Sequence, residues 1–455
     1  MKPFKQFVFG QTKEYRKPFS GAEVEALVER GRDILSRSAL PTEEQILAFF
    51  TRLTKAWSDP AYPRRKEALV ALKANSGLGD SLLDVIIENF PSLIDPEAIA
   101  KKIEGELGAR NMQDEPAGNG PAGERIIFRP AGMVLHVAPG NVFLGCIESL
   151  IDGIVTKNVN FLRMSSTDTS FPVIFAESIR EFDTEGVASP RTAVLWWEAG
   201  NDPVENIFKA EMDRIVFWGG YDALVNWKRG LGHSTVLVQH GPKISFGVVS
   251  ARGLRSEDMR DLVDRISLDM TMWEQKACNC PQMILIEKSA SDEKTGEFLK
   301  TLAESLERRT EEFPLGARTD DENVEILRAR ELALAKGIVK KEKIGISGPK
   351  MLDWTIIYDE EKDLTLQFSP LNRTMIVKRY SSMKSLEDLF KGRAFYLQTA
   401  GYALGEEEVA DYAKLLSKLG VTRLCRFGIM PIPTPGTPHD GSYALRDLTR
   451  VTVVE

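Results

Sequence analysis

The feature that most constrains the fold is an alternation of short apolar runs with helix-length segments between residues 133 and 239. The apolar runs are rich in β-branched or aromatic residues, and they are MVLHVAP (133–139), NFLRM (160–164), TAVLWW (192–197), RIVFW (214–218) and STVLVQ (234–239). The segments between them, long enough for helices, are 143–155, 168–182, 203–211 and 221–230. Apolar strands that alternate with helices are typical of a parallel sheet covered on both faces. The sequence therefore predicts a doubly wound α/β domain.

A second region of mixed character follows over residues 242–430. Helices are predicted at 256–273, 292–308, 321–336, 384–391 and 406–419, and strands at 282–287, 354–358, 364–368, 374–379 and 394–398. After a proline-rich loop within 421–441, the chain closes on RVTVVE, which is typical of a strand. The sequence thus predicts a second α/β domain followed by a short tail.

The segment before the first predicted strand has a different pattern. In residues 1–110 apolar side chains such as Val24, Leu27 and Val28 recur at helical spacing, which predicts a mostly helical leader. Residues 111–123 form a polar connector rich in Gly and Pro. We therefore expect a first domain at 1–241 that includes this leader, a second domain at 242–430, and a tail at 431–455.

Composition narrows the classes of function. The chain has 455 residues, with 59 Lys and Arg against 66 Asp and Glu, and this net charge of −7 argues against nucleic-acid binding. The N-terminus lacks the apolar core of a signal peptide, and Glu148 and Asp152 interrupt the most apolar window, so no membrane span is expected. Four cysteines are too few for a disulfide framework. A soluble, cytoplasmic protein is the expectation.

Small and polar residues follow each predicted strand of the first domain. In doubly wound sheets, ligands bind outside the carboxyl ends of the strands, where exposed backbone N–H groups suit a phosphate. The candidates for nucleotide binding on this ground are Pro139, Gly140, Ser165, Ser166, Gly219, Gly220 and Gly241. The two serines are equally consistent with a helix cap. Neither G-x-G-x-x-G nor G-x-x-x-x-G-K-[ST] supports the site, so a dinucleotide would bind without the usual pyrophosphate turn.

Cys278 and Cys280 stand at the junction between a predicted helix and a predicted strand. A zinc site needs about four ligands, and histidine is as scarce as cysteine, so no metal site is expected. Two interpretations of the pair are open. Both thiols pack as small buried hydrophobes, or one is a nucleophilic thiolate with the other packed beneath it.

The four histidines leave little material for imidazole chemistry. His136 alternates with apolar residues in a predicted strand and is expected in the core or at a subunit contact. His240 follows a strand, where a position facing the cofactor cleft and a role in a turn are equally open. For His439, in the sequence PHDG, an acid–base role and turn chemistry are both open.

Several motifs in order resemble those of the aldehyde dehydrogenase superfamily and, within it, the LuxC branch of acyl-CoA reductases. They are PAGMVLHVAPGNVF (130–143), KNVNFLRMSSTD (157–168), RIVFWGG (214–220), EQKACNCPQ (274–282) and PHDGSYALRDLTR (438–450). The resemblance spans 121–455 and implies an aldehyde-dehydrogenase-like fold, with two doubly wound parallel-sheet domains and a small oligomerisation element. It also implies a homo-oligomer, for which 112–130 and 448–455 are the candidate pairing segments.

The resemblance assigns roles that the spacing alone leaves open. It places Cys278 at the catalytic thiol, and Asn141 at the asparagine that donates to the thioester oxygen as this oxygen gains charge. Gln239 stands where hydrolytic relatives carry a water-activating glutamate, so hydrolysis should be poor. Arg163 matches the lysine beside the adenosine ribose, where it could pair with a 2′-phosphate, which favours NADP over NAD. Gly220 replaces a serine of the family's phosphate turn, so a side-chain contact to the phosphate is lost and backbone groups must bind it instead.

The function implied by this resemblance is NADPH-dependent reduction of fatty acyl-CoA to fatty aldehyde through an S-acyl cysteine, with release of CoA. The alternatives are an NAD(P)-dependent aldehyde dehydrogenase working towards acid, a nucleotide-free cysteine acyltransferase assisted by His439, and a non-catalytic subunit of a fatty-acid reductase complex. An acyl-protein synthetase and a thioesterase that supply acyl groups are the partners that the resemblance implies.

Overall fold

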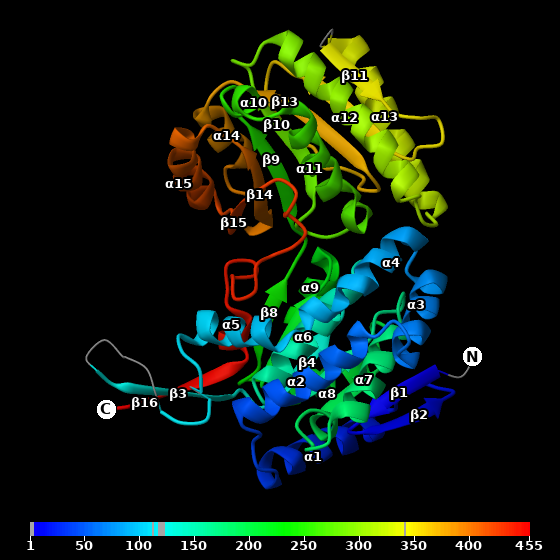
Figure 1. Cartoon of the computed structure of the whole chain (residues 1–455). Helices are drawn as coiled ribbons and strands as arrows, with labels where there is room; N and C mark the ends of the chain where they lie inside the picture. Colours follow the sequence, from blue (N-terminus) through cyan, green and yellow to red (C-terminus); the bar gives the residue numbers. More distant parts are fainter. Residues whose placement is uncertain (1–3, 112, 117–122, 341–342) are drawn as a thin grey trace. The chain divides into compact units, whose positions relative to one another are not determined.

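The computed structural model describes residues 4–111, 113–116, 123–340 and 343–455, which divide into two compact units. The first unit contains Met1–Ser76, Leu83–Gly241 and Thr434–Glu455, and the second contains Gly77–Leu82 and Pro242–Pro433. Each unit is built around a mixed, mostly parallel seven-stranded sheet, so the predicted α/β fold is confirmed (Figure 1). Among the described residues, no helix is long and apolar enough to cross a membrane.

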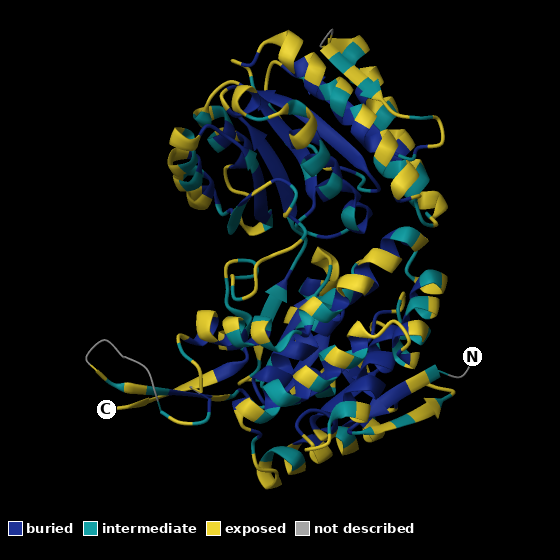
Figure 2. Cartoon of the chain, viewed as in Figure 1, coloured by how far each residue is buried: buried dark blue, intermediate teal, exposed yellow. Residues whose placement is uncertain are grey.

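The sheet of the first unit has the strand order β2-β1-β6-β5-β4-β7-β8. The five predicted apolar runs form its parallel part, as β4 (Met133–Val137), β5 (Val159–Arg163), β6 (Thr192–Leu195), β7 (Arg214–Trp218) and β8 (Val236–His240). Every residue of β4 and β6 is buried, because helices cover both faces of the sheet (Figure 2). The carboxyl ends of these strands therefore meet along one edge.

The helices of this unit come from the leader and from the strand crossovers. The leader contains α1 (Gly21–Arg37), α2 (Glu43–Ser58), α3 (Pro63–Asn75), α4 (Asp80–Asn89) and α5 (Pro96–Leu107), and the crossovers contain α6 (Phe143–Val155), α7 (Phe171–Phe182), α8 (Asp202–Glu211) and α9 (Tyr221–Lys228). Ser20 and Thr42 begin α1 and α2 with capping boxes. Helices α1, α8 and α9 pack together against one face of the sheet. Helices α6 and α7 also contact the strands but are not part of this group.

An N-terminal hairpin was not predicted. Strands β1 (Phe4–Val8) and β2 (Gln11–Tyr15) pair with each other, and β1 joins β6 in antiparallel orientation through Phe7 and Val8. Strand β2 reads QTKEY and lies at the edge of the sheet with largely exposed side chains, so it lacks the apolar signal that identified the central strands. The expectation of a mostly helical segment is accurate only from residue 21 onward.

The sheet of the second unit has the order β11-β12-β13-β10-β9-β14-β15. Its strands are β9 (Ile244–Val249), β10 (Pro281–Glu287), β11 (Lys343–Ser347), β12 (Thr355–Glu360), β13 (Thr374–Tyr380), β14 (Leu397–Ala403) and β15 (Arg423–Arg426), and only β11 is antiparallel to its neighbour. The helices are α10 (Gly253–Ser256), α11 (Met259–Thr271), α12 (Asp292–Glu312), α13 (Asp320–Lys340), α14 (Met383–Phe390) and α15 (Val409–Leu419). One face of the sheet packs against α11 and α12, and the other against α14 and α15.

Several features of this sheet differ from the prediction, which lacks the edge strand β11 and places a strand at 394–398 where β14 spans Leu397–Ala403. The fully buried strand β9 was missed: it begins soon after β8, and Ser245 and Gly247 interrupt its apolar run. The predicted strand at 364–368 is wrong, since this segment forms no ladder. Its alternating Leu364 and Leu366 pack instead against the core under α14 and α15.

The C-terminal tail returns to the first unit. After α16 (Ala444–Asp447), strand β16 (Thr449–Val454) pairs in antiparallel orientation with β3 (Arg125–Pro130) along its whole length. The two expected pairing segments thus form a separate two-stranded sheet, in which Val451 and Val453 are exposed. Residues 112 and 117–122 of the predicted segment lie outside the described residues. Assembly of a homo-oligomer through this sheet stays a prediction.

Candidate functional site

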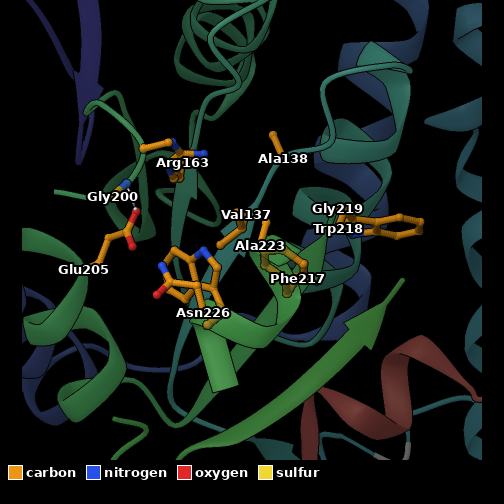
Figure 3. Close-up of a pocket in the computed structure, with 12 residues that line it drawn as sticks. Val137, Ala138, Arg163, Gly200, Glu205, Phe217, Trp218, Gly219, Ala223 and Asn226 are labelled. Carbon is orange, nitrogen blue, oxygen red and sulfur yellow. Dashed lines mark hydrogen bonds between the residues drawn. The ribbon is translucent and has the colours of Figure 1, made fainter. Parts of the chain in front are cut away.

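A pocket of about 130 Å³ opens at the carboxyl edge of the first sheet. Its wall is formed by the ends of β4, β5 and β7, the Ala199-Gly200 turn after β6, and side chains of α8 and α9 (Figure 3). This is the edge at which doubly wound sheets bind nucleotides. Arg163 and Gly219 are the members of the predicted nucleotide-binding set that line it.

Arg163 ends β5 and reaches the pocket from a largely buried position. Its guanidinium lies over the Trp197 ring, 5.5 Å from the centroid, and its Nη2 donates to the Trp197 carbonyl at 3.4 Å. The Nε atom is buried and has no hydrogen-bond partner among the described residues. Burial lowers the pKa of this guanidinium, and the carboxylate of Glu205 opposes that effect. Arg163 is therefore a stacked cation that retains an unused donor.

Glu205 is a second charged residue of the pocket, and it was not predicted. It lies in the first turn of α8 and is 1% exposed. One carboxylate oxygen accepts from the Gly200 N–H at 3.1 Å, while the other has no hydrogen-bond partner among the described residues (Figure 3). An acidic residue at this position resembles an ordinary helix cap in sequence, which explains why it gave no signal.

The remaining predicted nucleotide-binding residues are not among those that line this pocket. The Ser165 and Thr167 hydroxyls are 2.7 Å apart, and the Thr167 hydroxyl also donates to the Gly140 carbonyl at 2.9 Å, so the loops after β4 and β5 are joined. Pro139 lies in the first of these loops, and Ser166 is exposed in the second. Gly220 precedes α9 and has open space around it, and Gly241 follows β8.

Gly219 is a position where a side chain would not fit. A Cβ atom there would lie 2.7 Å from the ring of Phe217, which is buried in the core of the first unit. The glycine thus leaves room for the Phe217 ring, which lines the same pocket. Asn141, in contrast, is exposed in the turn that leads into α6.

Cys278 lies in the second unit, in the loop between α11 and β10. Its Sγ accepts a hydrogen bond from the Gln398 side-chain amide on β14 at 3.4 Å. The carbonyl of the same residue accepts from the Ser245 hydroxyl on β9 at 2.7 Å, and Ser245 Oγ in turn accepts from the Thr399 N–H at 3.1 Å. Residues of two neighbouring strands therefore hold the thiol and its backbone.

The four cysteines differ in burial. Cys278 is half-buried, whereas Cys146, Cys280 and Cys425 are buried. Burial raises the pKa of all three buried thiols, to about 11 for Cys425 and well above the ordinary value for Cys280. Cys280 also donates from Sγ to the Met272 carbonyl at 3.3 Å. Only a thiolate is a strong nucleophile, and burial disfavours the thiolate. The three buried cysteines are therefore poor candidates for the nucleophile.

The loop that carries Cys278 has an unusual backbone. Trp273, Glu274 and Gln275 all have positive φ angles, of 56°, 49° and 65°. The buried Gln275 side chain holds this turn, because its amide donates to the carbonyls of Pro281 and Thr374 and its oxygen accepts from the Thr374 N–H at 2.9 Å. Glu274 accepts from the N–H groups of Gly79 and Gly316. Hydrogen bonds from surrounding segments thus stabilise a strained turn next to the thiol.

Gln239 and His240 end β8 in the first unit. Gln239 has a buried side-chain oxygen with no partner among the described residues. His240 stacks on Trp218 with ring centroids 3.9 Å apart, and its Nδ1 lies 2.9 Å from a carboxylate oxygen of Asp440. His439 completes the cluster, 5.1 Å from the His240 ring. Sequence reasoning missed Asp440, which is far away in the chain, as it missed Gln398.

The cluster of His240, His439 and Asp440 could in principle hold a metal ion, since three ligand atoms lie within 4.8 Å of one another. The His240 and Asp440 ligand atoms already form a hydrogen bond with each other, so we interpret the group as an aspartate–histidine pair. Burial lowers the pKa of His439. His136, by comparison, is fully buried, contacts Ser149 and Asn160, and has its pKa lowered to about 4 by burial.

The pocket can accommodate part of a dinucleotide. A half-buried arginine and a buried glutamate line a cavity that also carries aromatic side chains, and each has a buried polar atom without a partner among the described residues. This donor and acceptor set suits a ribose and its phosphate. Gly219, which has no side chain, lines the same cavity. Arg163, Glu205 and Gly219 therefore fit a nucleotide cofactor.

The sequence of this chain is similar to those of known proteins. A "Long-chain acyl-protein thioester reductase" of Vibrio harveyi is 26% identical over 411 residues, which cover 89% of this chain and 81% of that protein. A protein with the same description from Photobacterium phosphoreum is also 26% identical, over 89% of this chain and 79% of the relative. Both relatives thus match this chain over most of its length.

Solved structures give the same fold. Aldehyde dehydrogenase 21 from Physcomitrella patens superimposes with a TM-score of 0.76 at 12% identity and covers 99% of this chain and 97% of its own. Aldehyde dehydrogenase C from Pseudomonas syringae, solved with NAD⁺ and octanal, gives a TM-score of 0.73 at 12% identity, over 99% and 96% of the two chains. The fold is that of the aldehyde dehydrogenases.

The family model described as "Acyl-CoA reductase (LuxC)" matches residues 39–451, which include the loop of Cys278, the second sheet and the first sheet apart from β1 and β2. The match extends from the leader helices to the strand that closes the C-terminus. On this evidence the chain belongs to the LuxC family of acyl-CoA reductases.

Proposed function

We propose that the protein reduces long-chain acyl thioesters to fatty aldehydes with NADPH, through a thioester on Cys278. The observation that carries this proposal is the contrast among the cysteines: three are buried with raised pKa values, whereas Cys278 is half-buried and accepts a hydrogen bond from Gln398. The similarity to proteins described as long-chain acyl-protein thioester reductases supports the substrate class.

In the proposed reaction, the Cys278 thiolate attacks the carbonyl carbon of the acyl thioester and forms a new C–S bond. The side-chain amide of Asn141 donates to the carbonyl oxygen as it gains negative charge, and one such donor is typically worth about 3 kcal/mol of the barrier. The original C–S bond then breaks, and the leaving thiol departs as a thiolate, which needs no general acid. The product of this half-reaction is the acyl group on Cys278.

The second half-reaction converts the acyl group to an aldehyde. A bound nicotinamide dinucleotide supplies the hydride to the carbonyl carbon. Asn141 again stabilises the oxyanion, and its collapse releases the aldehyde and returns the Cys278 thiolate. Gln239 cannot act as a general base, because an amide takes no proton from water. The acyl-enzyme therefore persists long enough to be reduced rather than hydrolysed.

Arg163, Gly219 and the neighbouring loops of Gly140 and Ser165 would hold the dinucleotide. The Arg163 guanidinium is suited to a 2′-phosphate, which supports NADPH as the cofactor. The acyl donor is either acyl-CoA or an acyl group on a partner such as a synthetase or a thioesterase. The exposed valines of β16, Val451 and Val453, support a homo-oligomer as the working form.

The test follows the acyl group. Wild-type protein mixed with long-chain acyl-CoA labelled in the acyl chain should retain label on the protein, and NADPH should release that label as aldehyde. Cys278→Ala should retain none, while Cys280→Ala, the matched control two residues away, should still be labelled. Labelling of Cys278→Ala, or a carboxylate as the main product of the wild type with NADPH, would overturn the proposal.

A further inference from the structure

The nucleotide pocket contains opposite charges. A cationic side chain was expected there, at Arg163, but Glu205 lines the same cavity from α8. The inference below rests on the proposed use of a nicotinamide dinucleotide and concerns which of the two dinucleotides the pocket favours.

Glu205 is only partly explained by local structure. Its contact with the Gly200 N–H, at 3.1 Å, uses one carboxylate oxygen. The second oxygen is buried without a partner among the described residues, although a buried carboxylate oxygen is costly to leave unpaired. A helix cap alone accounts for the first oxygen and not for the second. The second oxygen is thus available to accept a hydrogen bond from a ligand.

Arg163 presents the complementary situation. Its Nε is a buried donor that no described residue pairs with, and its guanidinium lies over Trp197. The two residues are close enough for their charges to interact, and no ion pair links them among the described residues. In Figure 3 they lie on the same side of the pocket, with the Glu205 carboxylate turned towards Gly200.

The two charges favour different ribose substituents. An acidic side chain accepts a hydrogen bond from the 2′-hydroxyl of NAD(H), whereas an arginine pairs with the 2′-phosphate of NADP(H). A 2′-phosphate is also repelled by a fixed carboxylate in a poorly solvated pocket.

We propose that Glu205 and Arg163 have opposite effects on cofactor specificity. Glu205 accepts a hydrogen bond from the 2′-hydroxyl of NADH and repels the 2′-phosphate of NADPH. The protein therefore binds both dinucleotides with affinities within about tenfold of each other, and Arg163 gives NADPH the remaining advantage.

The experiment measures binding rather than turnover. NADPH and NADH are titrated into the purified protein, and quenching of tryptophan fluorescence reports binding, since Trp218 and Trp227 line the pocket. Glu205→Gln keeps an oxygen for the Gly200 N–H and removes the charge. It should tighten NADPH by about tenfold and weaken NADH, because the carboxylate acceptor is lost. Arg163→Gln should weaken NADPH more than NADH.

A matched control is Asp202→Asn, which removes an exposed acidic charge three residues earlier in α8, outside the pocket lining. It should leave the ratio of the two affinities unchanged. If Glu205→Gln changes both affinities by the same factor, or neither, the proposal is wrong. Failure of the wild type to bind either dinucleotide would overturn the proposed function itself.

A measurement on the wild-type protein tests the proposal even if the variant does not fold. NADH that carries hydrogen in place of the 2′-hydroxyl cannot donate to Glu205, so it should bind about tenfold more weakly than NADH. Equal affinity for the two compounds would show that Glu205 does not contact this hydroxyl, and would overturn the proposal.

Discussion

His240 and Asp440 are separated by 200 residues in the chain, yet the His240 Nδ1 and an Asp440 carboxylate oxygen lie 2.9 Å apart. This contact joins the end of β8 to the segment that precedes α16. Asp440 also has a φ of 51°, a conformation that aspartate and asparagine tolerate better than most residues. Asp440 thus stabilises the C-terminal segment in two ways: it tolerates the positive φ angle, and its carboxylate contacts His240.

Substitutions of Asp440 should separate these two contributions. Asp440→Asn keeps a side-chain oxygen that accepts from Nδ1 and tolerates the backbone angle, so it should cost less than about 1 kcal/mol of stability. Asp440→Ala loses both the hydrogen bond to His240 and the tolerance of the backbone angle, so it should cost about 2 kcal/mol more stability than Asp440→Asn. Urea unfolding measures the difference, and limited proteolysis within 434–448 reports the local effect. Equal stabilities of the two variants would contradict this account.

Gln398 should control the reactivity of Cys278. A donor that contacts Sγ stabilises the thiolate, so Gln398→Leu should make the Cys278 thiol harder to ionise. The measurement is the rate of alkylation by iodoacetamide between pH 6 and 10, whose midpoint should move to higher pH. Gln282→Leu is the control, because Gln282 donates to the Lys243 carbonyl and should leave the profile unchanged. An unshifted profile in Gln398→Leu would refute the role.

Gln239→Glu should turn part of the activity into hydrolysis. The change places a carboxylate at the end of β8, where it can take a proton from water, and it should raise the release of free fatty acid from the acyl-enzyme by about tenfold or more. The assay measures fatty acid formed from acyl-CoA without NADPH. Gln239→Met, which supplies no base, should form no more acid than the wild type. The same acid yield from both variants would count against the proposed role of Gln239.

The sequence predicted the elements whose environment leaves a local signature. Strands β4 to β7 lie inside the first sheet, and every residue of β4 and β6 is buried, so their apolar runs were recognisable. Edge strands such as β2 carry no such pattern. Contacts between distant residues are likewise invisible: an acidic residue in a first helical turn, such as Glu205, looks like a cap until the fold brings it to the pocket of Arg163. Asp440 became interpretable only beside His240.

A buried carboxylate under the C-terminal segment makes stability depend on pH. Glu106 on α5 is 1% exposed, and one of its oxygens accepts from the Leu445 N–H at 2.7 Å. Burial raises the pKa of Glu106 to about 7, although Lys102 nearby acts in the opposite direction. Between the ordinary pKa of 4.5 and pH 7, the folded chain therefore retains a proton that the unfolded chain releases.

Because the folded state binds more protons in this window, its stability falls as pH rises from about 4.5 to about 7 and is fully retained below it. Glu106→Gln cannot ionise and still offers an oxygen to Leu445, so its stability relative to the wild type should grow with pH, by up to about 3 kcal/mol. Unfolding in urea at pH 5 and pH 8 measures this. Glu104→Gln, at an exposed position on the same helix, should show no such trend. A relative stability of Glu106→Gln that stays constant between the two pH values would show that Glu106 is ionised in the folded protein throughout.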